Sequence, residues 1–578
     1  MLSSFGVVVV LLLFGAPWTW LLYRRRSEPT LEAFLDRVCI GYAISFSLLF
    51  AAAQFRLLLF VPIWIAGVLA ALVLGWRRSE QQSERMQIGT DGWILLGSAV
   101  LYLGLRTLPF TVRILPIGWD AYFHMNISES ILERGRAVHD WLPYENMPLN
   151  YPIGLHLFMA LTQWLTGLRP HLFFDVILVW FTLLSGLQLF SLMTRATKDR
   201  RVGCYAALAY LFLGNLGSLH YIMWSGLPNL IGMYLFLGLL TALVVDEPSL
   251  PRSTAIFATY FLAACFVHHH VMVTAGLCLA WTTVVLFLMG DRVRAKRIAA
   301  GFVASGIIGI PYFGMYALRF MTLSNTKIGG YMERTADAWG LAQDIGLGFS
   351  AVVAVGLYLY FKNSERVSQI VIQSLVAMLI LYVFVEFIVR TLSFTLFEHE
   401  ISPFTPSRWI TDAVVLMSVF AGIFFRTLQS ESERARIPIV AMILAGFIVF
   451  NRATYRDSFR QAVPRERAEV YEWIRLNTAP NAALIEQDWH ASYLTHRMGS
   501  GFPLPTSEYS ALASNRNLLK RVAAGKQGPE TVNRQVIAIG DPRRKSPKGK
   551  VLWESPAGYR VIERFAPPTP ATGPSASR

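Results

Sequence analysis

Charged side chains are scarce in this sequence. They account for 15% of its 578 residues, whereas 54% are hydrophobic and the mean hydropathy is +0.44. Soluble proteins carry about 25% charged residues. Apolar runs long enough to cross a bilayer recur from Phe5 to Phe450. The composition excludes an ordinary soluble domain and predicts a polytopic α-helical membrane protein with about fourteen spans.

Cysteine is also rare, and the few cysteines do not form a recognisable pattern. All four lie inside apolar runs, where they are expected to be small buried side chains: Cys39, Cys204, Cys265 and Cys278. This placement argues against a disulfide framework and against a cysteine metal site. A Gly-rich nucleotide loop in a credible context is missing too, so a nucleotide-sugar donor or ATP is not supported.

A cleavable signal peptide is not evident either. The run Phe5–Tyr23 has no basic residue before it and is followed by Arg24, Arg25 and Arg26, as expected of an uncleaved first span with its N-terminus outside. Basic clusters orient the later spans and account for the net charge of +15 without nucleic acid. The run 153–167 is too short to cross, so it is predicted to be an interfacial or re-entrant helix.

These signals predict five regions and an integral protein of a bacterial or archaeal cell membrane, with both termini outside the cytoplasm. Residues 1–110 hold the first spans, 111–171 form a large outer loop, and 172–454 form the transmembrane core. The polar segment 455–565 is predicted to be a small outer α/β domain, with a helix after Pro464 and strands near 483–485, 536–539, 551–553 and 559–562. Residues 566–578 have the composition of a disordered tail.

The large outer loop contains a segment whose residue types suit catalysis. Asp120 and His124 are four residues apart, so on a helix both lie on one face. Asp120 is the candidate general base, although an aspartate at this position can also simply cap a helix. All eleven histidines fall on the predicted outer side, which suggests a site there. Longer outer loops would collect histidines as well.

Other outer residues are candidates for binding the substrate or its phosphate. Arg319 and Arg408 lie at the ends of predicted spans, where a guanidinium could bind phosphate or could anchor the span at the interface. His156 and His269 are placed in the same group. Asp120, Glu398 and Glu400 are candidate oxygen ligands for Mg²⁺ or Mn²⁺, although Glu398 and Glu400 also fit an ordinary solvated loop. No other cofactor is expected.

Three stretches together resemble the C-type membrane glycosyltransferases (the GT-C superfamily), and distantly the catalytic subunits of oligosaccharyltransferases. The first runs from Asp120-Ala-Tyr-Phe-His124 to Gly135 and is similar to the Asp motif of the family's first outer loop. The second is Tyr151-Pro-Ile-Gly-Leu-His156, and the third begins at Tyr471-Glu-Trp-Ile-Arg-Leu-Asn-Thr478. The plan of many spans with a soluble C-terminal domain is similar as well.

This resemblance implies an enzyme that transfers a sugar from a polyprenyl-phosphate or polyprenyl-diphosphate carrier to an acceptor on the outer face. The implied partners are membrane lipids, the lipid-linked donor, and a glycan, lipid or protein acceptor. Asp120 would be the essential carboxylate, acting as a base or holding a metal, and Arg408 lies where relatives place a phosphate-binding arginine. Glu398 or Glu400 matches a later loop carboxylate loosely.

The sequence departs from oligosaccharyltransferases at the acceptor motif. Where they carry Trp-Trp-Asp-Tyr-Gly, this chain has Gln487-Asp-Trp-His-Ala491, and it lacks the Asp-x-Asp pair of the second loop. The product is therefore expected to be a surface glycan or glycolipid. Two alternatives remain open: a glycolipid transporter or flippase, and a glycan polymerase or ligase of another fold.

Overall fold

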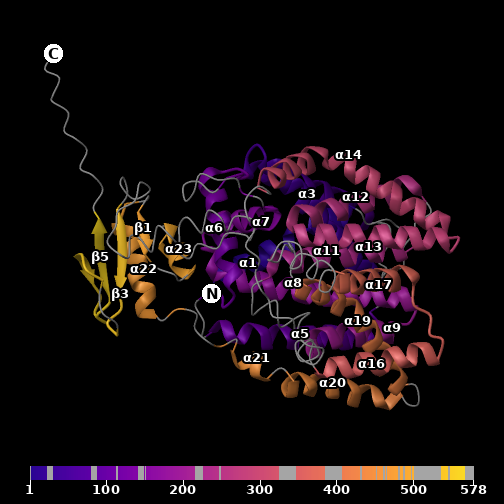
Figure 1. Ribbon diagram of the computed structural model, residues 1–578. Helices are drawn as coiled ribbons and strands as arrows, with labels where there is room; N and C mark the ends of the chain where they lie inside the picture. Colours follow the sequence, from indigo (N-terminus) through magenta and orange to yellow (C-terminus); the bar gives the residue numbers. More distant parts are fainter. Residues whose placement is uncertain are drawn as a thin grey trace.

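The structure is a computed structural model in which a large helical bundle carries a small sheet domain at one end (Figure 1). It describes these residues: 2–21, 30–79, 88–111, 115–140, 149, 151–214, 226–245, 249–323, 347–384, 406–429, 433–450, 452–457, 459, 463, 465–479, 482–485, 489–495, 498–499, 535–543 and 547–565.

The chain begins with helices that pack closely through glycine. The elements are α1 (Leu2–Phe14), α2 (Ala16–Leu21), α3 (Leu31–Ala53), η1 (Leu57–Leu59), α4 (Phe60–Ser79), α5 (Gly89–Thr107) and η2 (Leu108–Thr111). A Cβ atom on Gly41 of α3 would lie 2.4 Å from the carbonyl oxygen of Gly15. Only glycine therefore permits this approach, as is common where membrane helices pack.

Two shorter helices follow α5 and carry the candidate site. They are α6 (Trp119–Arg134) and α7 (Gly154–Thr166), with the short turn η3 (Pro170–Leu172) after them. Helix α7 has 13 residues, about 20 Å of helix, which is less than the roughly 30 Å of a bilayer core. Its first nine residues are buried against the bundle.

The central bundle is built around two helices that are buried on nearly all sides. Its elements are α8 (Phe174–Thr197), α9 (Arg200–Leu208), the π-helical turn η4 (Ala209–Leu213), α11 (Leu227–Val244), α12 (Leu250–Val267), α13 (His269–Leu288), α14 (Arg292–Leu323), α16 (Leu347–Lys362), α17 (Gln369–Val383), α19 (Pro406–Gln429), η7 (Glu433–Ala435), α20 (Arg436–Phe450) and α21 (Arg452–Asp457). The apolar windows of α8 and α11 are 89% and 83% buried, against 22% for α14. Helices α8 and α11 thus form the core, and α14 exposes an apolar face suited to lipid.

Eight of the described helices are long and apolar enough to cross a membrane, and five shorter apolar helices accompany them. This establishes the helical membrane class that was predicted. It does not establish the count of about fourteen spans, which stays a prediction. The four cysteines are all buried within described helices.

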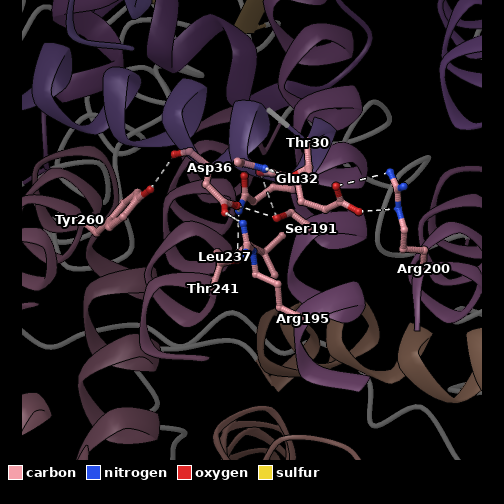
Figure 2. Close-up of polar contacts among 11 residues, drawn as sticks. Thr30, Glu32, Asp36, Ser191, Arg195, Arg200, Leu237, Thr241 and Tyr260 are labelled. Atoms are coloured by element: carbon pink, nitrogen blue, oxygen red, sulfur yellow. Dashed lines mark hydrogen bonds and ion pairs between the residues drawn. The ribbon is translucent and has the colours of Figure 1, made fainter. Parts of the chain in front are cut away.

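One end of the core is held together by ion pairs that join α3 to α8 and α9 (Figure 2). The carboxylate of Asp36 accepts hydrogen bonds from Arg195 Nη2 and Ser191 Oγ, each at 2.6 Å. Glu32 pairs with Arg200, with 2.7 Å between Oε1 and Nε. Because most of these groups are buried or half-buried, removing one partner would leave the other charge poorly solvated.

The C-terminal domain has a five-stranded mixed sheet. Its elements are α22 (Arg465–Asn477), β1 (Ala483–Ile485), α23 (Trp489–Thr495), β2 (Met498–Gly499), β3 (Val536–Gly540), β4 (Lys550–Glu554) and β5 (Arg560–Phe565). The strand order is β2-β1-β3-β5-β4; β1 runs parallel to β2 and β3, and the remaining pairs are antiparallel. The four predicted strands and the predicted helix are confirmed, whereas α23 and β2 were not predicted.

Candidate functional site

Asp120 lies in the first turn of α6, two residues after the N-cap residue Gly118. The amide groups of a helix N-terminus stabilise a carboxylate there, so this placement suits an ionised Asp120. The helix ends at Gly135, whose left-handed backbone (φ 66°) favours glycine. From Ala121 to Ile131 the helix is buried, but Asp120 is only partly buried. The carboxylate therefore lies where the buried helix meets an accessible surface.

One helical turn beyond Asp120, His124 contacts a histidine from the next helix. His124 Nδ1 lies 3.0 Å from His156 Nε2, and both side chains are buried. Helix α7 also packs closely on α12: a Cβ on its first residue, Gly154, would lie 2.7 Å from the carbonyl oxygen of Phe266. The two histidines link α6 to α7 immediately behind Asp120.

The ring of Tyr151 joins this pair to the histidines between α12 and α13. Its centroid lies 5.6 Å from the rings of His124 and of His156, 5.9 Å from His268 and 5.2 Å from His269. Three separate segments of the chain thus bring four imidazoles around one aromatic ring. We call these five residues the histidine cluster. Three of the predicted site residues, His124, His156 and His269, meet there.

Burial makes His156 a neutral member of the cluster. Desolvation lowers its pKa to about 3, against a smaller raising effect from the carbonyl groups of Pro152 and Ile153. At neutral pH the contact with His124 therefore involves an uncharged His156. His156 supplies a hydrogen bond that orients His124, not a positive charge for a phosphate.

The C-terminal domain docks on the same helix through Tyr493 of α23. The Tyr493 hydroxyl lies 3.1 Å from His171 Nδ1, and the ring packs against Tyr122 of α6 at 5.9 Å. Arg169 lies over the Tyr493 ring at 5.1 Å and pairs with Glu129 of α6 at 3.2 Å. Helix α23 begins at Trp489, inside the stretch that replaces the acceptor motif of oligosaccharyltransferases.

A buried aspartate that sequence reasoning overlooked connects α19 to the histidine cluster. Asp412 Oδ2 lies 3.0 Å from His270 Nε2, and Asp412 Oδ1 accepts a hydrogen bond from Asn229 Nδ2 at 3.3 Å. His270 directly follows His269 in the chain. The available signal was a charged residue within an apolar helix, which usually has a structural or functional role in membrane proteins.

The remaining predicted site residues are placed less completely. Arg319 lies near the end of α14 and Arg408 in the first turn of α19, one turn before Asp412; their side chains are outside the described part of the structure. Glu398 and Glu400 lie outside the described residues altogether. Whether the two arginines approach Asp120 stays a prediction.

The described residues do not form a metal centre. Within the ranges given above, no group of three histidine, cysteine, aspartate or glutamate side chains could hold a metal ion. Of the three predicted ligands only Asp120 is described. Mg²⁺ or Mn²⁺ binding by Asp120, Glu398 and Glu400 stays a prediction.

Comparison with known proteins identifies the fold. No family model matches the sequence, and no curated protein matches it either. The apo structure of the Archaeoglobus fulgidus oligosaccharyltransferase, however, superposes with a TM-score of 0.55 over 78% of this chain and 69% of that one, at 12% sequence identity. The chain therefore has the fold of this oligosaccharyltransferase. At this identity the likeness concerns the fold alone.

Two further structures of the archaeal enzyme are similar to a lesser degree. One is tethered to an acceptor peptide containing an NVT sequon, and the other holds an inhibitory peptide and a dolichol-phosphate. Their TM-scores are 0.48 and 0.44, and each again covers 78% of this chain and 69% of the other at 12% identity. The likeness to the apo structure confirms, for the architecture, the resemblance predicted from the three motifs.

Proposed function

We propose that this protein is a membrane glycosyltransferase that moves a sugar from a polyprenyl-phosphate or polyprenyl-diphosphate carrier to an acceptor at the membrane face that carries α6. The observation that carries the proposal is the position of Asp120: a partly buried carboxylate in the first turn of α6, one turn before the histidine cluster, in a GT-C fold. We take this face to be the outer one, following the basic clusters of the sequence.

In this proposal Asp120 acts on the acceptor. As a general base it removes the proton from the attacking acceptor group while the bond between the sugar and the carrier phosphate breaks. Partial burial keeps the carboxylate from full hydration, and the start of α6 keeps it ionised. The buried His124–His156 contact and the Tyr151 ring hold α6 in position, which matters because small misplacements of a catalytic group reduce the rate strongly.

The leaving phosphate needs cationic stabilisation, for which Arg408 and Arg319 are the proposed groups. A guanidinium binds a phosphate through two parallel hydrogen bonds. Arg408 is the stronger candidate, because Asp412 and His270 tie its helix to the segment that bears His269. We propose that His269 contacts the substrate from the edge of the cluster, since it is the more exposed of the two residues His268 and His269.

We leave the acceptor class open between a glycan, a lipid and a protein. In the stretch 487–491 a histidine and an alanine replace the tyrosine and the glycine of the oligosaccharyltransferase motif. Glycan and lipid acceptors fit this departure better than a sequon-containing peptide, which serves as a test substrate. The soluble domain is positioned to contribute to acceptor binding, because α23 packs on α6 through Tyr493.

The experiment compares turnover of polyprenyl-phosphate and polyprenyl-diphosphate sugars by the wild type and Asp120→Asn in liposomes, with and without EDTA. We expect sugar release or transfer by the wild type and a loss of at least about 100-fold in Asp120→Asn, as for removal of a general base. Asp140→Asn is the matched control, because Asp140 follows the same helix but pairs with Arg134 at 2.7 Å; it should retain turnover.

Each other result has a clear meaning. Full turnover in Asp120→Asn would overturn the assigned role of Asp120. Movement of the intact lipid-linked sugar across the bilayer, without transfer, would replace the proposal with the transporter. Unchanged turnover after EDTA treatment would remove the predicted metal.

A further inference from the structure

Arg106 is a fully buried cation that lacks an acceptor in the described part of the protein. It lies in the last turn of α5, and only 2% of it is exposed. None of its three guanidinium nitrogens, Nε, Nη1 and Nη2, makes a hydrogen bond of good geometry there, although the Tyr102 hydroxyl is close to the guanidinium. This sets it apart from buried or half-buried Arg195 and Arg200, which pair with carboxylates at the other end of the core.

The contacts of Arg106 are aromatic. Its Cζ atom lies 5.1 Å from the ring centroid of Tyr102 on α5 and 4.8 Å from that of Phe447 on α20. Tyr102 in turn packs edge-on against Phe212 of η4 at 5.8 Å. Four elements therefore meet around the guanidinium: α5, η4, α20 and, through the Tyr455 hydroxyl that donates to the Leu105 carbonyl at 2.9 Å, α21.

The two rings do not compensate for burying this charge. A cation–π contact contributes about 0.5–2 kcal/mol, whereas the effective penalty for burying an ion is several kcal/mol. Deprotonation does not remove this penalty, because the guanidinium stays protonated in proteins. The charge balance at this position calls for an anion.

Two buried tyrosines accompany Arg106: Tyr102, one turn before it on α5, and Tyr210, which neighbours Tyr102. Within the described residues neither hydroxyl makes a hydrogen bond of good geometry, although Thr182 lies near the Tyr102 hydroxyl and Ser185 near that of Tyr210. Tyr210 belongs to the π-helical turn η4, a type of irregularity that is frequent at functional sites, and it interacts electrostatically with Tyr102. One fork-shaped cation and two phenolic donors form a donor set suited to a phosphate, which accepts through several oxygens.

The surroundings of Arg106 indicate which kind of phosphate compound could reach it. Arg106 lies at the end of α5 that leads to Asp120, so it is near a membrane face and not at the bilayer centre. Its walls are the apolar rings of Tyr102, Phe212 and Phe447, and α5 exposes Leu101 on its outer side, at 42%. A lipid can approach along such a surface with its tail in the bilayer and its phosphate at the helix end.

We propose that Arg106, with the hydroxyls of Tyr102 and Tyr210, binds the phosphate ester of a membrane lipid. The site uses α5, η4 and α20, whereas the histidine cluster uses α6, α7 and the start of α13. It is therefore independent of the proposed transfer reaction. Half-buried Tyr455 on α21 covers the same turn of α5.

The test measures lipid bound to the purified full-length protein by native mass spectrometry after exchange into lipid-free detergent. Three ligands are titrated separately: phosphatidylglycerol, a polyprenyl phosphate and inorganic phosphate. We expect saturable binding of one of the two lipids to the wild type and weakening by about tenfold or more in Arg106→Met. Which of them binds identifies the source of the phosphate.

The control is Arg292→Met, because Arg292 also lies over an aromatic ring, at 5.7 Å from Phe287, but is exposed. It should bind like the wild type. Tyr102→Phe and Tyr210→Phe keep the rings and remove only the hydroxyls, so they test the site even if Arg106→Met fails to fold; weaker lipid binding is expected in both. Equal lipid binding by the folded variants and the wild type, binding of inorganic phosphate alone, or no binding by the wild type would overturn the proposal.

Discussion

At the scale of single residues, the candidate site depends on an imidazole that burial keeps neutral. His156 lies on α7, is fully buried and contacts His124 and Tyr151. Because burial lowers its pKa to about 3, the folded protein resists protonation at pH values where the unfolded chain accepts it. The site should therefore be sensitive to acid through its stability.

This gives a prediction about pH. The unfolded chain binds a proton near pH 6.5 and the folded chain only near pH 3, so His156 contributes no loss of stability above about pH 6.5 and a growing loss as the pH falls toward 3. At about pH 5 the loss approaches 2 kcal/mol. Thermal unfolding of His156→Gln should depend less on pH between about 7.5 and 5 than that of the wild type.

The control for that measurement is His171. Burial lowers the pKa of His171 to about 4, with a further lowering effect from Arg169, but His171 is outside the histidine cluster. His171→Gln should flatten the pH dependence of stability in the same way without disturbing His124. Identical pH profiles for His156→Gln and the wild type would contradict the assignment of a buried neutral His156.

At the scale of secondary-structure elements, Asp412 holds three helices together. Its carboxylate on α19 faces His270 and Thr274 of α13 and accepts a hydrogen bond from Asn229 of α11. All these groups are buried, and His270 directly follows His269 of the histidine cluster. The arrangement fixes the beginning of α13, and with it the place of His269.

We predict that Asp412→Leu lowers the free energy of unfolding by about 3–5 kcal/mol, because it leaves His270 and Asn229 facing an apolar side chain. The double variant Asp412→Leu/His270→Leu should recover part of this loss, since replacing both partners of a buried pair is far less harmful than removing one. A double-mutant cycle from thermal unfolding in detergent measures the coupling. Additive effects of the two substitutions would contradict a direct partnership.

At the scale of the whole molecule, the orientation in the membrane is the property that decides where the reaction occurs. The basic clusters of the sequence predict that α22 and the sheet lie outside, and that the turn between α16 and α17 lies inside. The four native cysteines are buried, so a maleimide is expected to label them only weakly. Leu476 on α22, at 67% exposed, and the exposed residue Ser364 in that turn are suitable positions for new cysteines.

We predict that a membrane-impermeant maleimide labels Leu476→Cys in intact cells and labels Ser364→Cys only after the cells are opened. The wild type should remain unlabelled in both conditions, which measures the background from the native cysteines. Labelling of Ser364→Cys in intact cells, or failure to label Leu476→Cys before lysis, would reverse or break the predicted topology. The proposed outer location of Asp120 would then be wrong as well.

Much of the fold could be predicted because it is encoded locally. Uncharged apolar runs become helices since a helix satisfies its backbone hydrogen bonds within the segment. The strands 483–485 and 536–539 were found from short runs of apolar and β-branched residues. Aspartate is favoured at helix starts, so the sequence was compatible with Asp120 at the beginning of a helix. The short element α23 and the two-residue strand β2 were missed, because segments of that length carry little periodicity.

The sequence by itself determined the membrane class and the α/β nature of the C-terminal domain. Only the tertiary structure decided that Tyr151 joins His124, His156 and His269, that Asp412 contacts His270 across 142 residues of chain, and that Arg106 is buried among aromatic rings. The physical reason is range: helical hydrogen bonds and periodicity act within a few residues, whereas these contacts depend on how distant helices pack.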